Sequence, residues 1–202
     1  MQHDEIRWKS YYEDRDKRKT SISRISHLLK KNGTIKVLDF CCGSGINGIY
    51  LARHGFDVSG FDLSPDGIRI AKKNSRRLRT HFRIWNMENK LPYNGASFDA
   101  VIIYRALYHA KLESIKRIAK EIERITRSGG LIYMESDQGP PVNYNKIGKL
   151  VAARTYLVDR GKEGMMYYHY FNKGELSKLF AKCKTKRFYF KDKRYSLLVQ
   201  RA

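Results

Sequence analysis

The chain has 202 residues, of which 42% are hydrophobic, and a formal net charge of +21. This length and composition provide a buried core for one domain, exclude an intrinsically disordered chain, and contain no apolar run long enough to cross a membrane. Because residues 1–19 lack the apolar core of a signal peptide, we expect a single cytoplasmic domain over residues 1–202 with no membrane span.

The excess of positive charge is the unusual feature of the composition. Lys and Arg number 41 against 20 Asp and Glu, with short basic clusters at residues 15–19, 72–79 and 182–194. Such a charge favours RNA, an anionic membrane surface or acidic partners. Because the cations are spread over nearly every segment, a solvated basic surface is the alternative, and nucleic acid stays one possible partner.

The three cysteines do not form a pattern for disulfides or for a metal. Cys41 and Cys42 are adjacent, and neither has metal-ligand spacing to a cluster of His or Cys. We therefore expect no metal site, a reducing compartment, and thiols that pack within a loop.

The first segment, residues 1–33, is predicted to be an N-terminal helical cap. Partial helical stripes of apolar residues run through it, and Gly33 supplies a helix stop. Near its start, Trp8 and Tyr12 are four residues apart and therefore share one face of a helix.

A strand, a glycine loop and a helix follow. Residues 35–40 are a predicted buried strand that carries Asp39, and residues 46–54 are the predicted helix. Three glycines between and within them stand at G-x-G-x-x-G spacing, namely Gly43, Gly45 and Gly48. Glycines at these positions allow a tight turn and let the backbone approach a ligand closely.

Two acids distinguish between the cofactors that such a loop can bind. Residues 56–61 are a second predicted strand, and Asp62 at its exit can accept hydrogen bonds from ribose hydroxyls. Asp39 beside the loop would repel the pyrophosphate of NAD or a flavin and attract a cation. S-adenosylmethionine has a ribose, a sulfonium and an ammonium group but no phosphate, so the two acids favour it. The alternative is that Asp39 only caps the turn.

Further helices and strands continue the pattern. Ser64 and Pro65 begin a helix that we predict to reach about Arg79. The third, fourth and fifth predicted strands are residues 81–86, 100–104 and 131–135. Isoleucines at spacings of three and four residues predict a helix over residues 111–127, which Gly129 and Gly130 end. The order strand–helix–strand, repeated four times, predicts a parallel sheet with helices on both faces.

The end of the fourth strand carries the candidate substrate site. In open α/β sheets, ligands bind outside the carboxyl ends of the strands. Four polar or aromatic residues stand there, namely Tyr104, Arg105, Tyr108 and His109. We expect them to form the floor of that site.

Residues 138–171 interrupt the pattern. Residues 151–158 are either an added strand or a helix, and residues 165–171 form an aromatic run, MMYYHYF. We expect an insertion that covers the substrate pocket, with packing on the sheet edge as the alternative. Beyond it, Asn172 and Glu175 form a capping box, and residues 187–191 and 195–200 form a hairpin.

The segment from residue 37 to residue 64 carries a family resemblance. DFCCGSG, residues 39–45, resembles motif I of class I S-adenosylmethionine-dependent methyltransferases, and GFDLSPDGI, residues 60–68, resembles their ribose-binding segment. The likeness covers residues 35–137 well and is closest to the small-molecule branch that includes tellurite-resistance and ubiquinone-biosynthesis-like enzymes. It implies a Rossmann-like, doubly wound, mostly parallel seven-stranded sheet with a closing antiparallel hairpin.

The resemblance also implies a cofactor site. It assigns S-adenosylmethionine, with S-adenosylhomocysteine as product, to these residues: Tyr12, Asp39, Cys41, Gly43, Gly45, Asn47, Asp62, Leu63, Asn86, Met87 and Tyr104. Asn86 departs from the family, which has Asp there as acceptor for the adenine amino group, although an amide oxygen can still accept. Tyr12, with Trp8, would cover the methionine end of the cofactor or pack as an ordinary core aromatic.

The leading functional hypothesis is methyl transfer to a small-molecule acceptor. His109, followed by His169, is the candidate base for an acceptor that must lose a proton, and Tyr104 is a second candidate catalytic residue. The alternatives are an RNA or protein methyltransferase docked by its basic surface, and a regulator without turnover. The sequence lacks motifs for methylation of DNA amino groups, cytosine C5 and ribose 2′-hydroxyls, and for metal-dependent catechol methylation.

Overall fold

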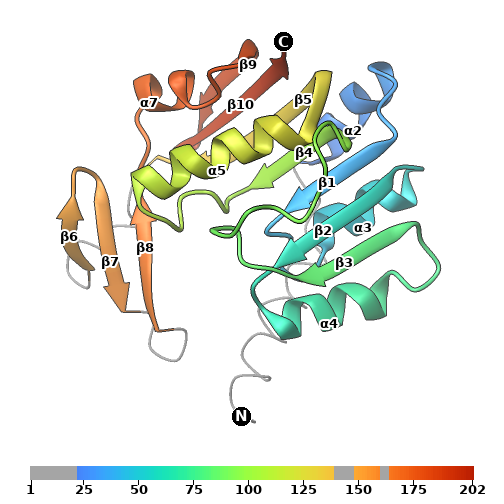
Figure 1. Cartoon of the computed structure of the whole chain (residues 1–202), viewed down its shortest axis with the longest axis horizontal. Helices are drawn as coiled ribbons and strands as arrows, with labels where there is room; N and C mark the ends of the chain where they lie inside the picture. Colours follow the sequence, from blue (N-terminus) through green and yellow to red (C-terminus); the bar gives the residue numbers. More distant parts are fainter. Residues whose placement is uncertain (1–21, 139–147, 160–163) are drawn as a thin grey trace.

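A seven-stranded sheet organises the computed structural model, which describes residues 22–138, 148–159 and 164–202 (Figure 1). The strands of this sheet are β1 (Lys36–Phe40), β2 (Asp57–Asp62), β3 (Thr80–Ile84), β4 (Phe98–Tyr104), β5 (Thr126–Asp137), β9 (Cys183–Lys191) and β10 (Arg194–Arg201). Their spatial order is β3-β2-β1-β4-β5-β10-β9. The first five are parallel, and β10 pairs antiparallel with both β5 and β9, so the predicted fold class and closing hairpin are confirmed.

Helices cover both faces of this sheet. They are α2 (Ile22–Lys31), α3 (Ile46–Arg53), α4 (Pro65–Asn74), α5 (Leu112–Ile125) and α7 (Lys173–Lys178). The central strands β1 and β4 are buried on both faces, which is why their sequences are nearly continuous apolar runs. α2 and α3 pack on the face that contains Val37 and Ile102, whereas α5 and α7 pack on the face that contains Leu38 and Ile103.

Two predicted helix ends are wrong. α4 ends at Asn74 rather than near Arg79, because residues 75–79 turn the chain into β3, with the Leu78 N–H donating to the Ser75 carbonyl. α5 ends at Ile125 rather than at the glycine pair, since Thr126 is extended and begins β5.

The glycine pair has a different role from the predicted one. Gly130 lies within β5, near the register shift between Phe98 and Ala100 of β4. A Cβ atom at Gly130 would lie 2.9 Å from the Asp99 carbonyl oxygen. The glycine is therefore required by the close approach of two backbones in the sheet, not by the helix end.

The fourfold strand–helix–strand repeat is also wrong, because residues 85–97 connect β3 to β4 without a helix. The connection is held by α5 instead. The Arg124 guanidinium donates to the Tyr93 carbonyl at 2.9 Å, and the Leu91 N–H donates to Glu121 at 3.1 Å. Tertiary hydrogen bonds thus replace the backbone bonds that a helix would make within itself.

A second, three-stranded antiparallel sheet comprises β6 (Gly148–Ala152), β7 (Thr155–Asp159) and β8 (Met165–His169). It resolves residues 151–158 into parts of two strands rather than a helix, and the aromatic run becomes β8. The sheet stands on the side to which the arrowheads of the parallel strands point (Figure 1). The His169 N–H donates to the Tyr108 carbonyl at 2.8 Å, which attaches β8 to the segment after β4.

Some predictions fall outside the described residues. Trp8 and Tyr12 lie there, as do most of the predicted cap and parts of the predicted insertion, residues 1–21, 139–147 and 160–163. Within the described residues, Gly33 ends α2 with a left-handed φ of 65°, as predicted. No helix in these parts of the chain is long and apolar enough to span a membrane.

The amino end of β1 is attached to β4 by one carboxylate, which leads to a stability prediction. Asp99 Oδ2 accepts from the N–H groups of Ile35 and Lys36 at 2.8 and 2.7 Å, and Asp99 Oδ1 pairs with Arg127. Burial alone would raise the pKa of Asp99, but these donors outweigh it and lower the pKa. We expect Asp99→Ala to lower the free energy of unfolding by about 2 kcal/mol at neutral pH.

Urea denaturation tests this prediction, with Asp99→Asn as control because it keeps one acceptor oxygen and loses the charge. A carboxylate whose folded-state pKa is lowered stabilises the protein above the unfolded value, and this contribution disappears as pH falls below about 4. The difference between wild type and Asp99→Ala should therefore shrink in acid. A difference independent of pH would contradict the assigned role of the charge.

Candidate active site

The loop between β1 and α3 has an unusual backbone. Cys41, Gly43 and Gly45 have φ angles of 52°, 55° and 76°, all in the left-handed region. Gly45 is the N-cap of α3 and provides no side-chain acceptor. The first two N–H groups of α3, those of Ile46 and Asn47, therefore have no acceptor among the described residues, whereas the third, that of Gly48, donates to Asp39. A left-handed non-glycine residue such as Cys41 is uncommon and is typical of functional turns.

Two carboxylates fix this loop by accepting hydrogen bonds from backbone N–H groups. Asp39 in β1 is 1% exposed and accepts from the Gly48 N–H of α3 at 2.8 Å. Asp62 at the end of β2 accepts from the Gly43 N–H at 2.8 Å and from the Ser64 N–H at 2.9 Å. The two predicted acids therefore fix opposite ends of the same loop.

The electrostatics of this pair favour a cationic ligand. Burial raises the pKa of Asp39 to about 7, against the opposing effect of the Gly48 hydrogen bond and with a smaller contribution from the charge of Asp62. Burial also raises the pKa of Asp62, although three backbone N–H groups oppose it. In the described residues no cation is paired with either carboxylate, so a positively charged ligand would relieve their desolvation.

The glycines of the loop are required by packing as well as by any ligand. A Cβ atom at Gly48 would lie 3.0 Å from Asp39 Oδ2, and one at Gly45 would lie 2.8 Å from the Cβ atom of Ala71 in α4. A Cβ atom at Gly67, a residue for which the sequence predicted no role, would lie 2.9 Å from the Gly43 carbonyl oxygen. The glycine pattern thus reports how closely α3 and α4 approach the loop.

The cysteines of the loop are neutral packing groups, as expected. Burial, together with the charges of Asp62 and Asp39, raises the pKa of both Cys41 and Cys42 well above the usual range of a thiol. The Cys41 Sγ atom lies 3.6 Å from the Sδ atom of Met87, which brings the β1 loop to the segment after β3.

Three further residues predicted to bind the cofactor lie at neighbouring strand ends, and Asn86 and Met87 are the ones predicted for the adenine. Leu63, after β2, is 64% exposed, and Asn86 and Met87 follow β3. Asn86 Oδ1 already accepts from the Glu88 N–H at 2.9 Å, so its second lone pair is what an adenine amino group would use. Trp85, which the sequence analysis did not single out, has a buried indole N–H without an acceptor among the described residues.

The predicted substrate floor lies next to this loop. Phe40 pairs with Ile103, so Tyr104, the last residue of β4, lies beside Cys41. The His109 ring packs between Tyr108 and Tyr168 of β8, with centroid distances of 4.3 and 4.6 Å. Tyr104 and His109 are both half-buried, at the edge where the sheet ends.

A charged cluster at this edge was found only in the structure. Arg105 has a left-handed φ of 54° and donates twice to Asp137 Oδ2, from Nε and Nη2 at 3.1 and 2.9 Å. Arg194 of β10 approaches Asp137 Oδ1 at 3.3 Å. Asp137 and Arg194 lie far from Arg105 in sequence. The parallel β4–β5 pair brings Asp137 to Arg105, and the antiparallel β5–β10 pair adds Arg194.

The second candidate base, His169, has a structural position. Its side chain is fully buried, with Nδ1 2.9 Å from Thr155 Oγ1 and Nε2 3.5 Å from Glu175 Oε2. Burial lowers its pKa against the opposing effect of Glu175, which favours a neutral ring. His169 therefore connects the small sheet to α7, and the structure does not place it at the open edge with His109.

Comparisons with known proteins decide the class of this site. Residues 37–130 match the family described as methyltransferase domain. This part of the chain is a methyltransferase domain. Glycine N-methyltransferase from Mus musculus is 33% identical over 124 residues, which cover 54% of this chain and 42% of the relative. Demethylmenaquinone methyltransferase from Leptospira interrogans is 27% identical over 129 residues, which cover 58% of this chain and 51% of that relative.

A solved structure shows the same fold. An S-adenosylmethionine-dependent methyltransferase from Clostridium acetobutylicum superposes with a TM-score of 0.74 at 12% identity, over 96% of this chain and 99% of that one. The chain spans about half the length of the curated relatives it matches. The family match over residues 37–130 confirms the sequence-based assignment of a methyltransferase domain to that part of the chain, and the superposition with the S-adenosylmethionine-dependent enzyme shows the same fold.

The residues of the methyltransferase domain fit this cofactor. Asp39 and Asp62 are acceptors without a paired cation, the loop has open N–H groups, and Leu63 offers an exposed apolar surface beside them. In the described parts of the chain, no three side chains of His, Cys, Asp or Glu are grouped so that they could hold a metal ion.

The raised pKa of Asp39 predicts opposite effects on stability and on binding. Because ionisation is disfavoured in the folded state, the free energy of unfolding should fall as pH rises from about 4 towards 7. We expect Asp39→Asn to stabilise the ligand-free protein by about 2 kcal/mol at about pH 8, with a smaller gain near pH 5, and to weaken binding of S-adenosylmethionine.

Urea denaturation at both pH values and calorimetric titration with S-adenosylmethionine measure these effects. Gly48→Ala is the matched control, because it disturbs the same contact without removing the charge. A destabilised Asp39→Asn variant at about pH 8 would mean that its carboxylate is stabilised in the fold, contrary to the argument from burial.

Proposed function

We propose that this chain transfers a methyl group from S-adenosylmethionine to a small-molecule acceptor. The observation that carries the proposal is the pair of carboxylates, Asp39 and Asp62, that hold the glycine loop at the carboxyl edge of the sheet. A buried acidic site beside free helix N–H groups suits a ligand with both a cationic and a hydrogen-bonding part.

The proposed cofactor contacts follow the loop and the neighbouring strand ends. Asp62 binds the ribose hydroxyls, while the loop residues Cys41, Gly43, Gly45 and Asn47 and the acid Asp39 hold the methionine part. Leu63, Asn86 and Met87 bind the adenine, and Tyr104 lies between cofactor and acceptor. When bound, the cofactor supplies an electrophilic methyl group on a good, neutral leaving group.

The chain's own contribution to methyl transfer is positioning. Holding the acceptor in line with the methyl group contributes up to about 7–11 kcal/mol in ideal cases. The aromatic side chains of Tyr108 and Tyr168 are buried beside His109, next to the proposed cofactor site. These aromatic side chains favour a small acceptor that is enclosed between the edge of the main sheet and the small sheet. Covering this acceptor is the role that we propose for the segment 138–171.

The names of two related enzymes state small-molecule acceptors, which supports a small acceptor for this chain. One acts on glycine and another on demethylmenaquinone, so the same domain serves acceptors of quite different shape. An amine acceptor that is already neutral needs no base, whereas a hydroxyl acceptor does. We propose His109 as that base, since its ring lies at the edge where the acceptor would enter.

A label-transfer assay tests the proposal. Protein given methyl-labelled S-adenosylmethionine and a cell extract should place label in the small-molecule fraction. Asp62→Ala should abolish most of this transfer and weaken cofactor binding at least about tenfold in calorimetry, because the ribose loses a charged acceptor. Asp57→Ala is a control that should leave both unchanged, because Asp57 lies at the amino end of β2, opposite the proposed site. Label in a nuclease-sensitive or protein fraction would overturn the small-molecule assignment.

The role of His109 is tested once a labelled product is known. With a hydroxyl acceptor, we expect His109→Gln to reduce kcat about 100-fold and to remove the dependence of the rate on pH near neutrality. With an amine or thiol acceptor the rate should change little. An unchanged rate and pH profile with a hydroxyl acceptor would assign His109 to packing against Tyr168.

A further inference from the structure

The strongest unexplained feature of the molecule is a basic face formed by α4, the turn after it and β3. Its cations are Arg69, Lys72, Lys73, Arg76, Arg77, Arg79 and Arg83, with His81 among them in the sequence, and all of these residues are exposed. We call this set the α4–β3 face. None of them belongs to the proposed cofactor or acceptor site, so the methyl transfer reaction does not explain them.

Two grooves lie on this face and are connected. The first has a volume of about 660 Å³ and an apolar floor that includes Ile68 and Ile84, with Arg69, Lys72 and Arg76 on its walls. The second, of about 550 Å³, is more polar and includes Arg83. Lys72 and Arg76 line both grooves, so their charges stand at the junction.

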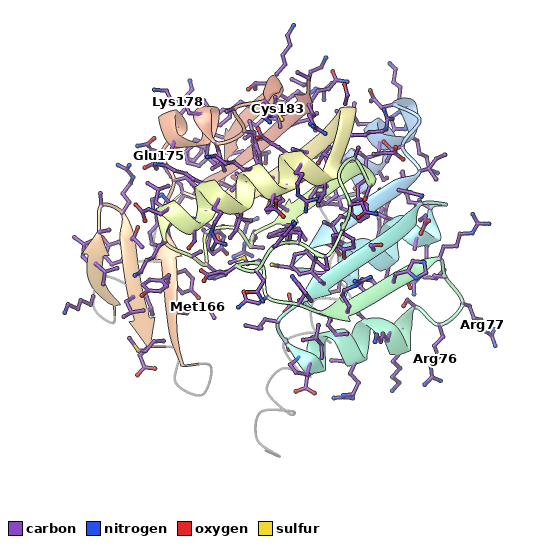
Figure 2. The ribbon with its side chains drawn as sticks, in the orientation of Figure 1. Arg76, Arg77, Met166, Glu175, Lys178 and Cys183 are labelled. Atoms are coloured by element: carbon purple, nitrogen blue, oxygen red, sulfur yellow. The ribbon has the colours of Figure 1, made fainter. Side chains whose placement is uncertain are left out.

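The charges on this face are largely uncompensated. Arg69 pairs with Asp66 at 3.2 Å, and His81 lies 3.9 Å from Asp57. For the remaining six cations, no carboxylate of the described residues lies within ion-pair distance. Figure 2 shows Arg76 and Arg77 extending away from the body of the protein beyond the end of α4. Such a field attracts a polyanion and repels other cations.

The arrangement of the cations indicates an extended ligand. From Arg69 to Arg76 the helix and turn advance by about 10 Å, with Lys72 and Lys73 between them. A single phosphate could contact only part of this row, whereas a strand with one phosphate per nucleotide could contact all of it. Ile84, which is 53% exposed on the groove floor, offers an apolar surface to unstacked bases.

We propose that the α4–β3 face binds the sugar–phosphate backbone of single-stranded RNA. A membrane surface fits less well, because membrane-binding faces present protruding apolar side chains, whereas here the apolar residues form the floor of a groove between cations. The basic strand β9 is not equivalent, since it lies at the opposite edge of the sheet and lines neither groove.

This docking surface goes beyond the proposed function. The first groove begins at Pro65, next to Ser64, whose N–H donates to Asp62 of the proposed cofactor site. Bound RNA would therefore lie beside the carboxyl edge without entering the acidic loop, which would repel its phosphates. Docking does not depend on which molecule accepts the methyl group.

The test is fluorescence anisotropy with a fluorescein-labelled single-stranded oligonucleotide RNA, measured over a series of salt concentrations without cofactor. The full chain should bind with an affinity that falls steeply with salt. Lys72→Glu combined with Arg76→Glu should weaken binding at least about tenfold and lower the salt slope by about 0.7 for each lost phosphate contact. Lys184→Glu combined with Lys186→Glu, on β9, makes the same change in net charge and should have a much smaller effect.

Each other outcome overturns the proposal. Equal losses in the two double variants would mean that net charge, and not this face, binds RNA. Binding only to vesicles that contain phosphatidylserine would assign the face to a membrane, and binding to neither probe would assign no partner of this chemistry. Calorimetry with S-adenosylmethionine checks that both variants keep the folded cofactor site. Because RNA binding is measured without methyl transfer, its failure is distinguishable from failure of the proposed function.

Discussion

The buried carboxylate of Asp39 is the constraint on which the rest of the site depends. It ends the central strand in a place where water is excluded, and its main hydrogen bond comes from the backbone of α3. Gly48 leaves room for that bond, because a Cβ atom there would lie only 3.0 Å from Asp39 Oδ2 and would press on the carboxylate. The loop, the start of α3 and the neighbouring Asp62 are thus arranged around a carboxyl group whose charged form is disfavoured by burial and is paired with no cation among the described residues. Burying this carboxylate costs free energy, and a bound cationic ligand would offset that cost.

The topology of the sheet gathers the remaining functional groups at one edge. Parallel strands all end on the same side, so Asp62, Tyr104 and Asp137 stand in a row although they come from β2, β4 and β5. The antiparallel strand β10 starts where β5 ends and adds Arg194 to that row. The small sheet is attached there as well, through the hydrogen bond between His169 and Tyr108. Rigid strands fix the base of the site, and the segments after them supply its variable walls.

Charge is separated between the interior of the site and the surface of the protein. The loop beneath the proposed cofactor is acidic, with Asp39 and Asp62 unpaired, while the molecule as a whole carries a formal charge of +21. The negative field of the loop and the positive field of the surface act on different ligands and over different distances. A small cation is attracted only within the dry loop, whereas a polyanion is attracted to the α4–β3 face and repelled from the loop. The basic composition and the acidic site are therefore compatible.

Local patterns in the sequence determined the sheet, the glycine loop and the two acids. Alternation of apolar runs and glycines is a short-range signal, and the capping box of Asn172 and Glu175 is one too; both were predicted and are present. The helix-free path of residues 85–97 and the strand position of Gly130 depend on contacts with α5 and β4, which no local pattern encodes. The same holds for the Arg105–Asp137–Arg194 cluster and for the burial of His169. Tertiary structure alone decided these features, because each joins residues that are distant in the chain.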